Sequence, residues 1–454
     1  MAAGTMADAP RRVQGIGSSI AALFRGIGRP KRMLNRQDQA DTGVTSLAAD
    51  FGAKILDLAS QLAKWTELPE GLMCTFYSPA HRAAAAQLHD WMELAGLNAQ
   101  IDAVGNVIGR YASADPLART LIVASHYDTV ANAGHFDGRL GILTGLVVAE
   151  HIKKSGHRLP FHLEVIGFSE EEGVRFSAPY LGSGAIAGCF DERALARRDV
   201  NDISLATVLR NEGVDLETIQ KLTRPPETLR GYLEVHIEQG PLLLQNDLSV
   251  GIVTSITGST RFRIVIQGVA GHAGTVPMPL RHDAATAAAE IILEVERRCS
   301  AVPNLVGTVG QIVVPNGLIN VIPGSCELSL DIRSVDDATR EDAIDDIKDS
   351  IEEITKRRRV TASIRELSRH RAVPCAQQMQ SAFADAVTKT GIKPFYLPSG
   401  AGHDAEMFSG VTDIGMLFVR CGNGGISHSP LETVTAADAG VAARILLDVL
   451  LNLA

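Results

Sequence analysis

The stretch TLIVASHYDTVANAGHFDGRLG, residues 120–141, decides the fold and the chemistry that we expect of this chain. Its apolar, β-rich run at 121–124 ends in Ser-His-x-Asp, so His126 and Asp128 follow a predicted strand, and Asp137 comes just before a glycine. Histidine nitrogens and carboxylate oxygens are the ligands that borderline divalent metals such as zinc prefer. Because open α/β sheets bind their ligands at the carboxyl ends of strands, the stretch predicts a metal site at such an end.

The size and charge of the chain narrow the classes of protein to consider. Its 454 residues are too many for one compact core, so two domains are expected. Hydrophobic residues make up 45% and charged residues 21%, as in ordinary soluble globular proteins. The net charge of -9 implies no broad basic surface, so we expect no nucleic-acid partner. No apolar stretch is long enough to span a bilayer, so we expect no membrane partner either.

The cysteines favour a reducing compartment. No C-x-x-C pair occurs, and the six cysteines lie far apart: Cys74, Cys189, Cys299, Cys326, Cys375 and Cys421. This spacing argues against a disulfide scaffold and against a thiolate zinc site. We therefore expect a cytoplasmic protein.

Residues 1–47 differ from the rest and are expected to form a flexible basic extension. Arginine and lysine crowd this segment, whose only acidic residues before Gln39 are Asp8 and Asp38. Such a segment resembles an Arg-rich transit peptide, but a disordered extension or an upstream start codon, with Met33 as the true start, is the favoured interpretation. The run GIGSSIAALF is too short and too glycine-interrupted for a secretory signal.

Strand-like and helical runs alternate along the chain, which indicates an α/β sheet with helices on its faces. Strands are expected at 106–111, 120–125, 162–168, 231–237 and 414–419, and helices at 47–65, 80–95, 141–155, 378–390 and 436–451. The pattern changes to a small α+β unit with strands at 259–267, 306–314 and 325–333 and helices at 284–298 and 340–356.

The fold class that follows is α/β, with a discontinuous catalytic domain at 48–252 and 371–454. An α+β lid, which would also make the dimer contact, is inserted at 253–370. Hinges near 251–255 and 373–374 would let the lid close over a substrate.

Further candidate metal ligands follow other predicted strands. Glu170, Glu171 and Glu172 end an apolar run, His236 lies within one, and His428 follows a glycine-rich turn. Taken singly, each has an ordinary alternative: a solvated acidic turn, a satisfied core histidine and a solvated loop histidine. Together with the first stretch they supply the ligands of a two-metal hydrolase, in which a carboxylate bridges metals about 3.5–4 Å apart.

The motifs SHYDTV, EEEGVRF, HIEQGP, GHAGTVPM, NVIPG, DIR, SGAGHDA and GISHSP resemble those of the hydantoinase/carbamoylase group of binuclear metallo-amidohydrolases. That group belongs to the wider M20 metallopeptidase-like superfamily. The motifs occur in the family's order from about residue 48 to the C-terminus, and HIEQGP with GHAGT is specific to the amidohydrolase branch.

The resemblance implies two divalent metal ions, zinc or manganese, per subunit. Each would be held by three side chains: His126, Asp137 and His236 for one ion, and Asp137, Glu172 and His428 for the other. Asp128 would fix the tautomer and orientation of His126. Glu171 would be the general base toward the attacking water and would return the proton to the leaving nitrogen.

The resemblance also implies a substrate pocket shared between two subunits. His272 would polarise the scissile carbonyl, and Asn320 and Arg333 would grip the carboxylate of a small ureido substrate. A homodimer is therefore expected, in which these three residues act in trans. The pocket would be completed by four more residues: Gln239, Arg261, Gly402 and His403. Without the resemblance, Arg333 could be a strand arginine in a surface pair and Asn320 a turn cap.

One position departs from the family pattern. The family often has a Gly-Gly pair before the bridging aspartate, whereas this chain reads Gly134-His135-Phe136 before Asp137. We interpret His135 as a rim residue because Asp137 keeps its spacing of eleven from His126.

Two substrate classes fit the expected hydrolysis of a linear ureido or carbamoyl C–N bond. Allantoate, cleaved to ureidoglycine, ammonia and CO2, is favoured by the runs MLFVRCGNGGISHSPLE and LMCTFYSPAHRAAAAQLHDWM. The alternative is an N-carbamoyl-L-amino acid hydrolase or β-ureidopropionase. An M20 aminoacylase or peptidase is disfavoured by HIEQGP and GHAGT, and a non-catalytic scaffold by the presence of every expected ligand.

Overall fold

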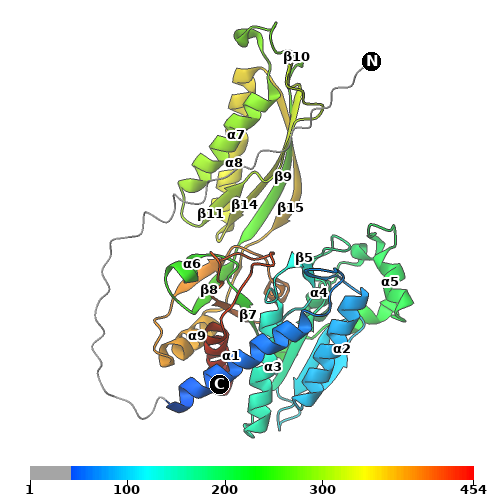
Figure 1. Cartoon of the computed structure of the whole chain (residues 1–454), viewed down its shortest axis with the longest axis vertical. Helices are drawn as coiled ribbons and strands as arrows, with labels where there is room; N and C mark the ends of the chain where they lie inside the picture. Colours follow the sequence, from blue (N-terminus) through cyan, green and yellow to red (C-terminus); the bar gives the residue numbers. More distant parts are fainter. Residues whose placement is uncertain (1–41, 454) are drawn as a thin grey trace, which may run out of the picture. The chain divides into compact units, whose positions relative to one another are not determined.

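A nine-stranded sheet forms the larger body of the computed structural model, which describes residues 42–453 (Figure 1). The strand order is β16-β8-β18-β7-β4-β6-β3-β2, with β17 beside β8. Their bounds are β2 (Asn98–Ile101), β3 (Val107–Tyr111), β4 (Thr120–His126), β6 (His162–Phe168), β7 (Leu229–Ile237), β8 (Val250–Ile256), β16 (Val373–Pro374), β17 (Tyr396–Ser399) and β18 (Ile414–Val419).

The four central strands, β18, β7, β4 and β6, run parallel and are almost wholly buried. Parallel strands are buried on both faces because their connections place helices on both sides, and here the faces alternate along each strand. Leu121 and Val123 of β4 belong to one core cluster, and Ile122 and Ala124 to the other. Since the four strands point the same way, their carboxyl ends lie along one edge of the sheet.

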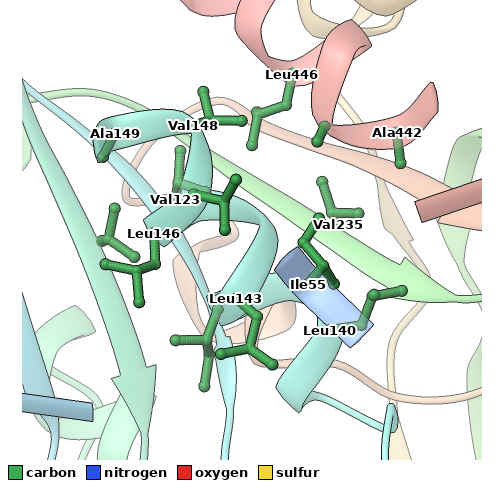
Figure 2. Packing of buried hydrophobic residues seen from close by; sticks show 14 of the residues in the cluster. Ile55, Val123, Leu140, Leu143, Leu146, Val148, Ala149, Val235, Ala442 and Leu446 are labelled. Atoms are coloured by element: carbon green, nitrogen blue, oxygen red, sulfur yellow. The ribbon is translucent and has the colours of Figure 1, made fainter. Parts of the chain in front are cut away.

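Helices cover the first face. They are α1 (Thr42–Leu62), α2 (Pro79–Leu94), α3 (Arg139–Lys154), α9 (Gln377–Lys389) and α10 (Ala436–Asn452). Figure 2 labels side chains of this core, including Ile55 of α1, Leu143 of α3 and Leu446 of α10 near Val123 and Val235 of the sheet. The packed helix α3 follows directly after Asp137 and Gly138, so the core fixes the position of the loop that carries Asp137.

The second face is covered by shorter elements. They include α4 (Leu181–Ala187) and the 3-10 helix η5 (Asp404–Phe408). Tyr232 of β7 stacks on Phe408 with ring centroids 4.5 Å apart, and Phe168 of β6 lies beside both rings. This packing holds η5 against the sheet. The remaining elements of the larger body are β1 (Leu72–Cys74), β5 (Thr129–Ala133), α5 (Leu205–Asn211) and α6 (Leu242–Gln245).

A second, antiparallel sheet forms the inserted unit, in the order β11-β14-β9-β15, with β12 paired to β14. Its strands are β9 (Gly258–Gln267), β11 (Leu305–Thr308), β12 (Ile312–Val313), β14 (Ser325–Ser334) and β15 (Thr361–His370). Helices α7 (Ala284–Ser300) and α8 (Asp337–Arg358) pack on this sheet (Figure 1). A small hairpin of β10 (Gly271–His272) and β13 (Val321–Ile322) completes the unit.

The expected α/β class is confirmed, but three local predictions differ from the structure. The strand expected at 306–314 is split into β11 and β12, because Gln311 turns aside to bond Ser329 through its amide and its carbonyl. The sheet change expected at 253 falls later, since β8 runs to Ile256. Helix α1 begins at Thr42, inside the segment expected as extension; residues 1–41 of that segment lie outside the described part of the chain.

The segments expected as hinges lie side by side. Val373 of β16 pairs with Ile256 of β8, and Pro374 pairs with Ser255. The chain therefore enters and leaves the inserted unit at neighbouring points of the larger sheet. Among residues 42–453, every helix falls short of the length and apolarity needed to cross a membrane.

Candidate active site

Five of the candidate ligands lie at the carboxyl edge of the central parallel strands. His126 ends β4, Glu171 and Glu172 follow β6, His236 lies near the end of β7, and His428 follows β18. Asp137 reaches the same edge from the loop before α3. Residues separated by up to about 300 positions along the chain thus meet because parallel strands end together.

The side chains form two triads that share Asp137. In the first, His236 Nε2 lies 3.3 Å and His126 Nε2 lies 3.8 Å from Asp137 Oδ1. In the second, His428 Nε2 lies 3.1 Å from Asp137 Oδ2 and 3.6 Å from Glu172 Oε1. Each triad therefore uses a different oxygen of one carboxylate, as a bridging ligand does.

The chemistry of these groups fits divalent metal ions. Glu172 Oε1 is buried and has no hydrogen-bond partner among the described residues. Burial and the charge of Asp137 raise the pKa of Glu172 to about 8, while the hydrogen bond with Asp137 raises the pKa of His428 to about 9. Buried carboxylates that repel one another, set among imidazole nitrogens, are relieved by a cation between them.

The histidines of the first triad are held by backbone carbonyls. His126 Nδ1–H donates to the carbonyl oxygen of Asp128 at 3.1 Å, and His236 Nδ1–H donates to that of Ile237 at 2.9 Å. Both Nε2 atoms are therefore unprotonated and lie toward Asp137, and that of His236 accepts the backbone amide of Gly138 at 3.2 Å. Such bonds fix the tautomer and the ring plane of a metal-binding histidine.

The Asp128 carboxylate has a different place from the one expected. It lies 3.6 Å from His126 Nδ1 and accepts hydrogen bonds from the backbone amides of Glu171 and Glu172, at 3.0 and 3.1 Å. The expected orientation of His126 is thus provided by the carbonyl of Asp128. Its carboxylate positions the loop that carries Glu171 and Glu172.

The alternative of a solvated acidic turn at residues 170–172 is wrong. Glu170 is 0% exposed and Glu171 is 9% exposed. Burial, followed by the charges of Glu172 and other nearby carboxylates, raises the pKa of Glu171 well above its usual value. Glu171 Oε2 lies 3.9 Å from His126 Nε2, so a proton acceptor stands directly beside the first triad.

The loop of Asp137 is fixed by a glycine and by a carboxylate that the sequence analysis did not assign. Gly138 has φ 65°, and a Cβ there would lie 2.4 Å from the His126 ring. The amides of Phe136 and Asp137 donate to Glu432 Oε1, at 2.8 and 3.2 Å. Glu432 lies four positions after His428, in the run GISHSPLE, and this closeness to a candidate ligand is the feature of the sequence that could have pointed to it.

A fully buried polar layer lies behind the first triad. Glu234 accepts hydrogen bonds from Ser125 Oγ and Tyr232 Oη, at 2.8 and 2.9 Å. His403 Nε2 lies 2.7 Å from Ser399 Oγ, and its ring meets that of His236 edge-on. Glu234 escaped the sequence analysis, although it shares a strand face with His236. His403, expected to contact substrate, lies in this layer.

A cavity of about 290 Å³ opens in front of the triads. Four of the residues expected to bind substrate line it: Gln239, Arg261, Arg333 and Gly402. Gln239 Nε2 donates to Asp137 Oδ2 at 3.0 Å, which links the pocket wall to the shared carboxylate. His135 is exposed and belongs to neither triad, in agreement with its interpretation as a rim residue.

The two arginines of the cavity are held by one aspartate. Arg333 donates through Nε and Nη2 to the two oxygens of Asp331, at 3.1 and 2.9 Å, and Arg261 Nε donates to the same carboxylate at 3.1 Å. Arg333 Nη1 also donates to the carbonyl of Gly400 at 2.6 Å. The guanidinium groups are therefore fixed in direction, with N–H groups left for an anionic ligand.

Replacing Arg333 by lysine is expected to raise KM about 10-fold or more and to change kcat little. The positive charge stays, but the planar pair of donors that suits a carboxylate is lost. Steady-state kinetics on a carboxylated substrate give the measurement. Arg263→Lys is the matched control, since this arginine of the same sheet pairs with Glu327 outside the cavity. An unchanged KM in Arg333→Lys would remove Arg333 from substrate binding.

His272 and Asn320 do not line this cavity. Both are exposed on the hairpin of the inserted unit, where the amide of Ala273 donates to the Asn320 carbonyl at 3.0 Å. His272 Nδ1 accepts the backbone amide of Gly274 at 3.0 Å, so Nε2 is the ring nitrogen that is left for another contact. The fold of one chain thus brings together all the candidate metal ligands but only some of the residues expected to bind substrate.

Comparison with known proteins places the chain in a family. The model of peptidase family M20/M25/M40 matches residues 122–452. Allantoate deiminase 1 of Glycine max is 40% identical over 424 residues, covering 87% of this chain and 88% of that protein. N-carbamoyl-L-amino acid amidohydrolase of Geobacillus stearothermophilus is 39% identical over 378 residues, covering 83% and 92%.

A solved structure agrees with these relatives. A hydantoinase/carbamoylase family amidase from Burkholderia multivorans has a TM-score of 0.82 and 30% identity, covering 88% of this chain and 97% of that chain. The resemblance identified from the motifs is thereby confirmed. The chain belongs to peptidase family M20/M25/M40 and, within it, to the hydantoinase/carbamoylase amidases.

Proposed function

We propose that this protein is a two-metal amidohydrolase that cleaves one ureido group of allantoate, giving ureidoglycine, CO2 and ammonia. The observation that carries the proposal is the pair of triads sharing Asp137, with Glu171 beside the first triad and Arg333 across the same cavity. The site thus combines groups for C–N hydrolysis with groups for a carboxylate. Allantoate deiminases among the relatives support allantoate as the substrate.

The residues of the chain account for the proton movements. Two divalent ions, zinc or manganese, would be held by the triads and would supply Lewis-acid polarisation of the carbonyl and a more acidic water. Glu171 takes a proton from the attacking water as it adds to the carbamoyl carbon. The same proton then passes to the leaving nitrogen, and the bond between that nitrogen and the carbamoyl carbon breaks. The released carbamate decomposes to CO2 and ammonia.

A second candidate function is hydrolysis of N-carbamoyl-L-amino acids. The observation in its favour is the 39% identity to the Geobacillus stearothermophilus enzyme that bears this name. The two functions need the same triads and the same base, so they differ only in the group beside the substrate carboxylate.

The proposed function is tested by ammonia release from purified, metal-loaded protein. Allantoate and a panel of N-carbamoyl-L-amino acids are assayed side by side, each with a chelated control. Chelator-sensitive release from allantoate supports the proposal, and release from carbamoyl amino acids alone would replace it by the second candidate. Activity that persists after chelation would contradict the metal mechanism.

We further propose a homodimer in which the hairpin of one subunit completes the cavity of the other. His272 and Asn320 lie outside the cavity of their own chain, yet both occur in motifs of the family's substrate residues. As in other symmetric dimers, each subunit would give and receive the same contact. The six unpaired cysteines support a reducing cytoplasm as its location.

Co-expression of two inactive variants tests the shared site. His272→Ala is expected to lower kcat about 10²- to 10³-fold, as for loss of an oxyanion donor. Combined with Glu171→Gln, it forms mixed dimers in which one site has both native residues, restoring about a quarter of wild-type activity. If His272 acts within its own chain, mixed dimers stay as inactive as either parent.

A further inference from the structure

Glu406 is a carboxylate in the cavity that neither the metal triads nor the carboxylate-binding arginines use. It lies in η5 and lines the cavity together with Tyr180, Gly402 and Arg333. Among residues 42–453, the Glu406 carboxylate forms no ion pair and no hydrogen bond to another side chain, and its protein donor is the backbone amide of His403. It therefore faces the cavity as an acceptor without a fixed side-chain partner.

The Glu406 carboxylate lies close to the backbone of Gly402. A Cβ at position 402 would lie 2.1 Å from Tyr180 Oη and 2.9 Å from Glu406 Oε1. The tyrosine hydroxyl and the glutamate oxygen thus converge over the backbone of Gly402. Tyr180 has φ 61° and is the residue before α4, at the end of the loop that starts with Glu171 and Glu172. This wall is therefore built next to the reacting groups.

The surroundings of Glu406 shift its pKa in opposite directions. Burial raises the pKa of Glu406 to about 7, against the lowering effects of the His403 backbone amide and the Arg333 charge. Arg333 forms its hydrogen bonds with Asp331 and Gly400 and none with Glu406. N–H donors from a ligand would stabilise the ionised form.

The rest of the cavity wall is mostly polar. Among the described residues that line it, none is Leu, Ile, Val, Phe or Met. Polar walls include Gln239, Thr257, Ser259 and His370. An aliphatic substrate side chain would find only a small apolar surface here, from Pro179, Ala401 and the ring of Tyr180, and it would bury Glu406 without a partner, which is unfavourable.

We propose that Glu406 determines specificity by accepting the two parallel N–H groups of a second ureido group on the substrate. A monosubstituted urea presents an N–H and an NH2 side by side, in the manner of a guanidinium edge, and both match the two oxygens of a carboxylate. The inference rests on the proposed function and deepens it: the site selects carboxylates that bear two ureido groups over N-carbamoyl amino acids with apolar side chains.

The test compares Glu406→Gln with wild type on two substrates that differ by the second ureido group, allantoate and N-carbamoylglycine. Glutamine has the same size as glutamate and keeps one side-chain oxygen, which can still accept the His403 amide. Its second acceptor oxygen is replaced by an NH2 donor. We expect kcat/KM for allantoate to fall about 30- to 100-fold, mainly through KM, and that for N-carbamoylglycine to change less than about 3-fold. Glu406→Leu should raise turnover of N-carbamoyl-L-leucine.

Binding provides a second measurement that does not depend on turnover. In a Glu171→Gln background, adding Glu406→Gln should weaken allantoate binding about 30- to 100-fold by calorimetry and leave N-carbamoylglycine binding unchanged. Glu217→Gln is the matched control, because Glu217 is an exposed glutamate in the first turn of another 3-10 helix, η2 (Leu216–Leu222).

Several outcomes would overturn the inference. An equal loss on both substrates would make Glu406 a residue that only positions its loop, and no loss on either would remove it from the ureido subsite. A wild-type preference for N-carbamoyl-L-leucine over allantoate would contradict it as well. Failure of the wild type to hydrolyse any ureido substrate would instead overturn the proposed function itself.

Discussion

Replacing Glu171 by glutamine is expected to lower kcat about 10³- to 10⁴-fold while leaving the metal content unchanged. Glu171 belongs to neither of the two triads that share Asp137, and its Oε2 lies 3.9 Å from His126 Nε2, the ring nitrogen on the side of Asp137. Glutamine preserves its shape but can neither take the proton from water nor return it to the leaving nitrogen, and general acid–base catalysis commonly contributes rate factors up to this size.

The measurement pairs single-turnover kinetics with metal analysis of the purified protein. Glu296→Gln, an exposed glutamate on α7, is the control for the change of residue type. Near-normal turnover in Glu171→Gln would show that another group is the base. A loss of metal together with activity would make Glu171 a ligand.

The central sheet could be predicted because its strands are buried on both faces. Strands β4, β6, β7 and β18 read as mainly apolar runs, and candidate metal ligands lie at or just after the end of each of them. Strand β15 was missed because most of its side chains are exposed, so it lacks the apolar pattern that identifies a strand. Pairing with β9 makes it a strand, which is a tertiary effect.

The candidate ligands could be predicted from residue type and place, but the groups that hold them in position could not. Glu432 accepts the backbone amide of Asp137 from 295 positions further along the chain, and Glu234 lies two positions before His236 on the same strand. The carbonyl of Asp128, which bonds His126, has no signature in a sequence, because every residue has such a carbonyl. Glu406 became a candidate only when the fold brought Tyr180 and Gly402 against it.

The second large effect is expected at Asp137, the only residue that both triads share. Its Oδ1 faces His126 and His236, and its Oδ2 faces His428. Asparagine has the same shape but lacks the negative charge and one of the two oxygens. We expect Asp137→Asn to reduce metal content from two ions per chain to fewer than one and to lower kcat/KM at least about 10⁴-fold, because Lewis-acid catalysis requires the bound ions.

Glu172→Gln is the matched comparison, because of the two triads that share Asp137, Glu172 is a member only of the one with His428, although it also lies within ligand distance of His126 and Glu171. It should lose one ion and keep the other. Each ion stabilises the fold by about 4 kcal/mol when free metal exceeds Kd 1,000-fold, so a chelator should lower Tm most in the wild type, less in Glu172→Gln and least in Asp137→Asn. Two ions retained in Asp137→Asn, or equal chelator shifts in all three proteins, would show that Asp137 does not join two metal sites.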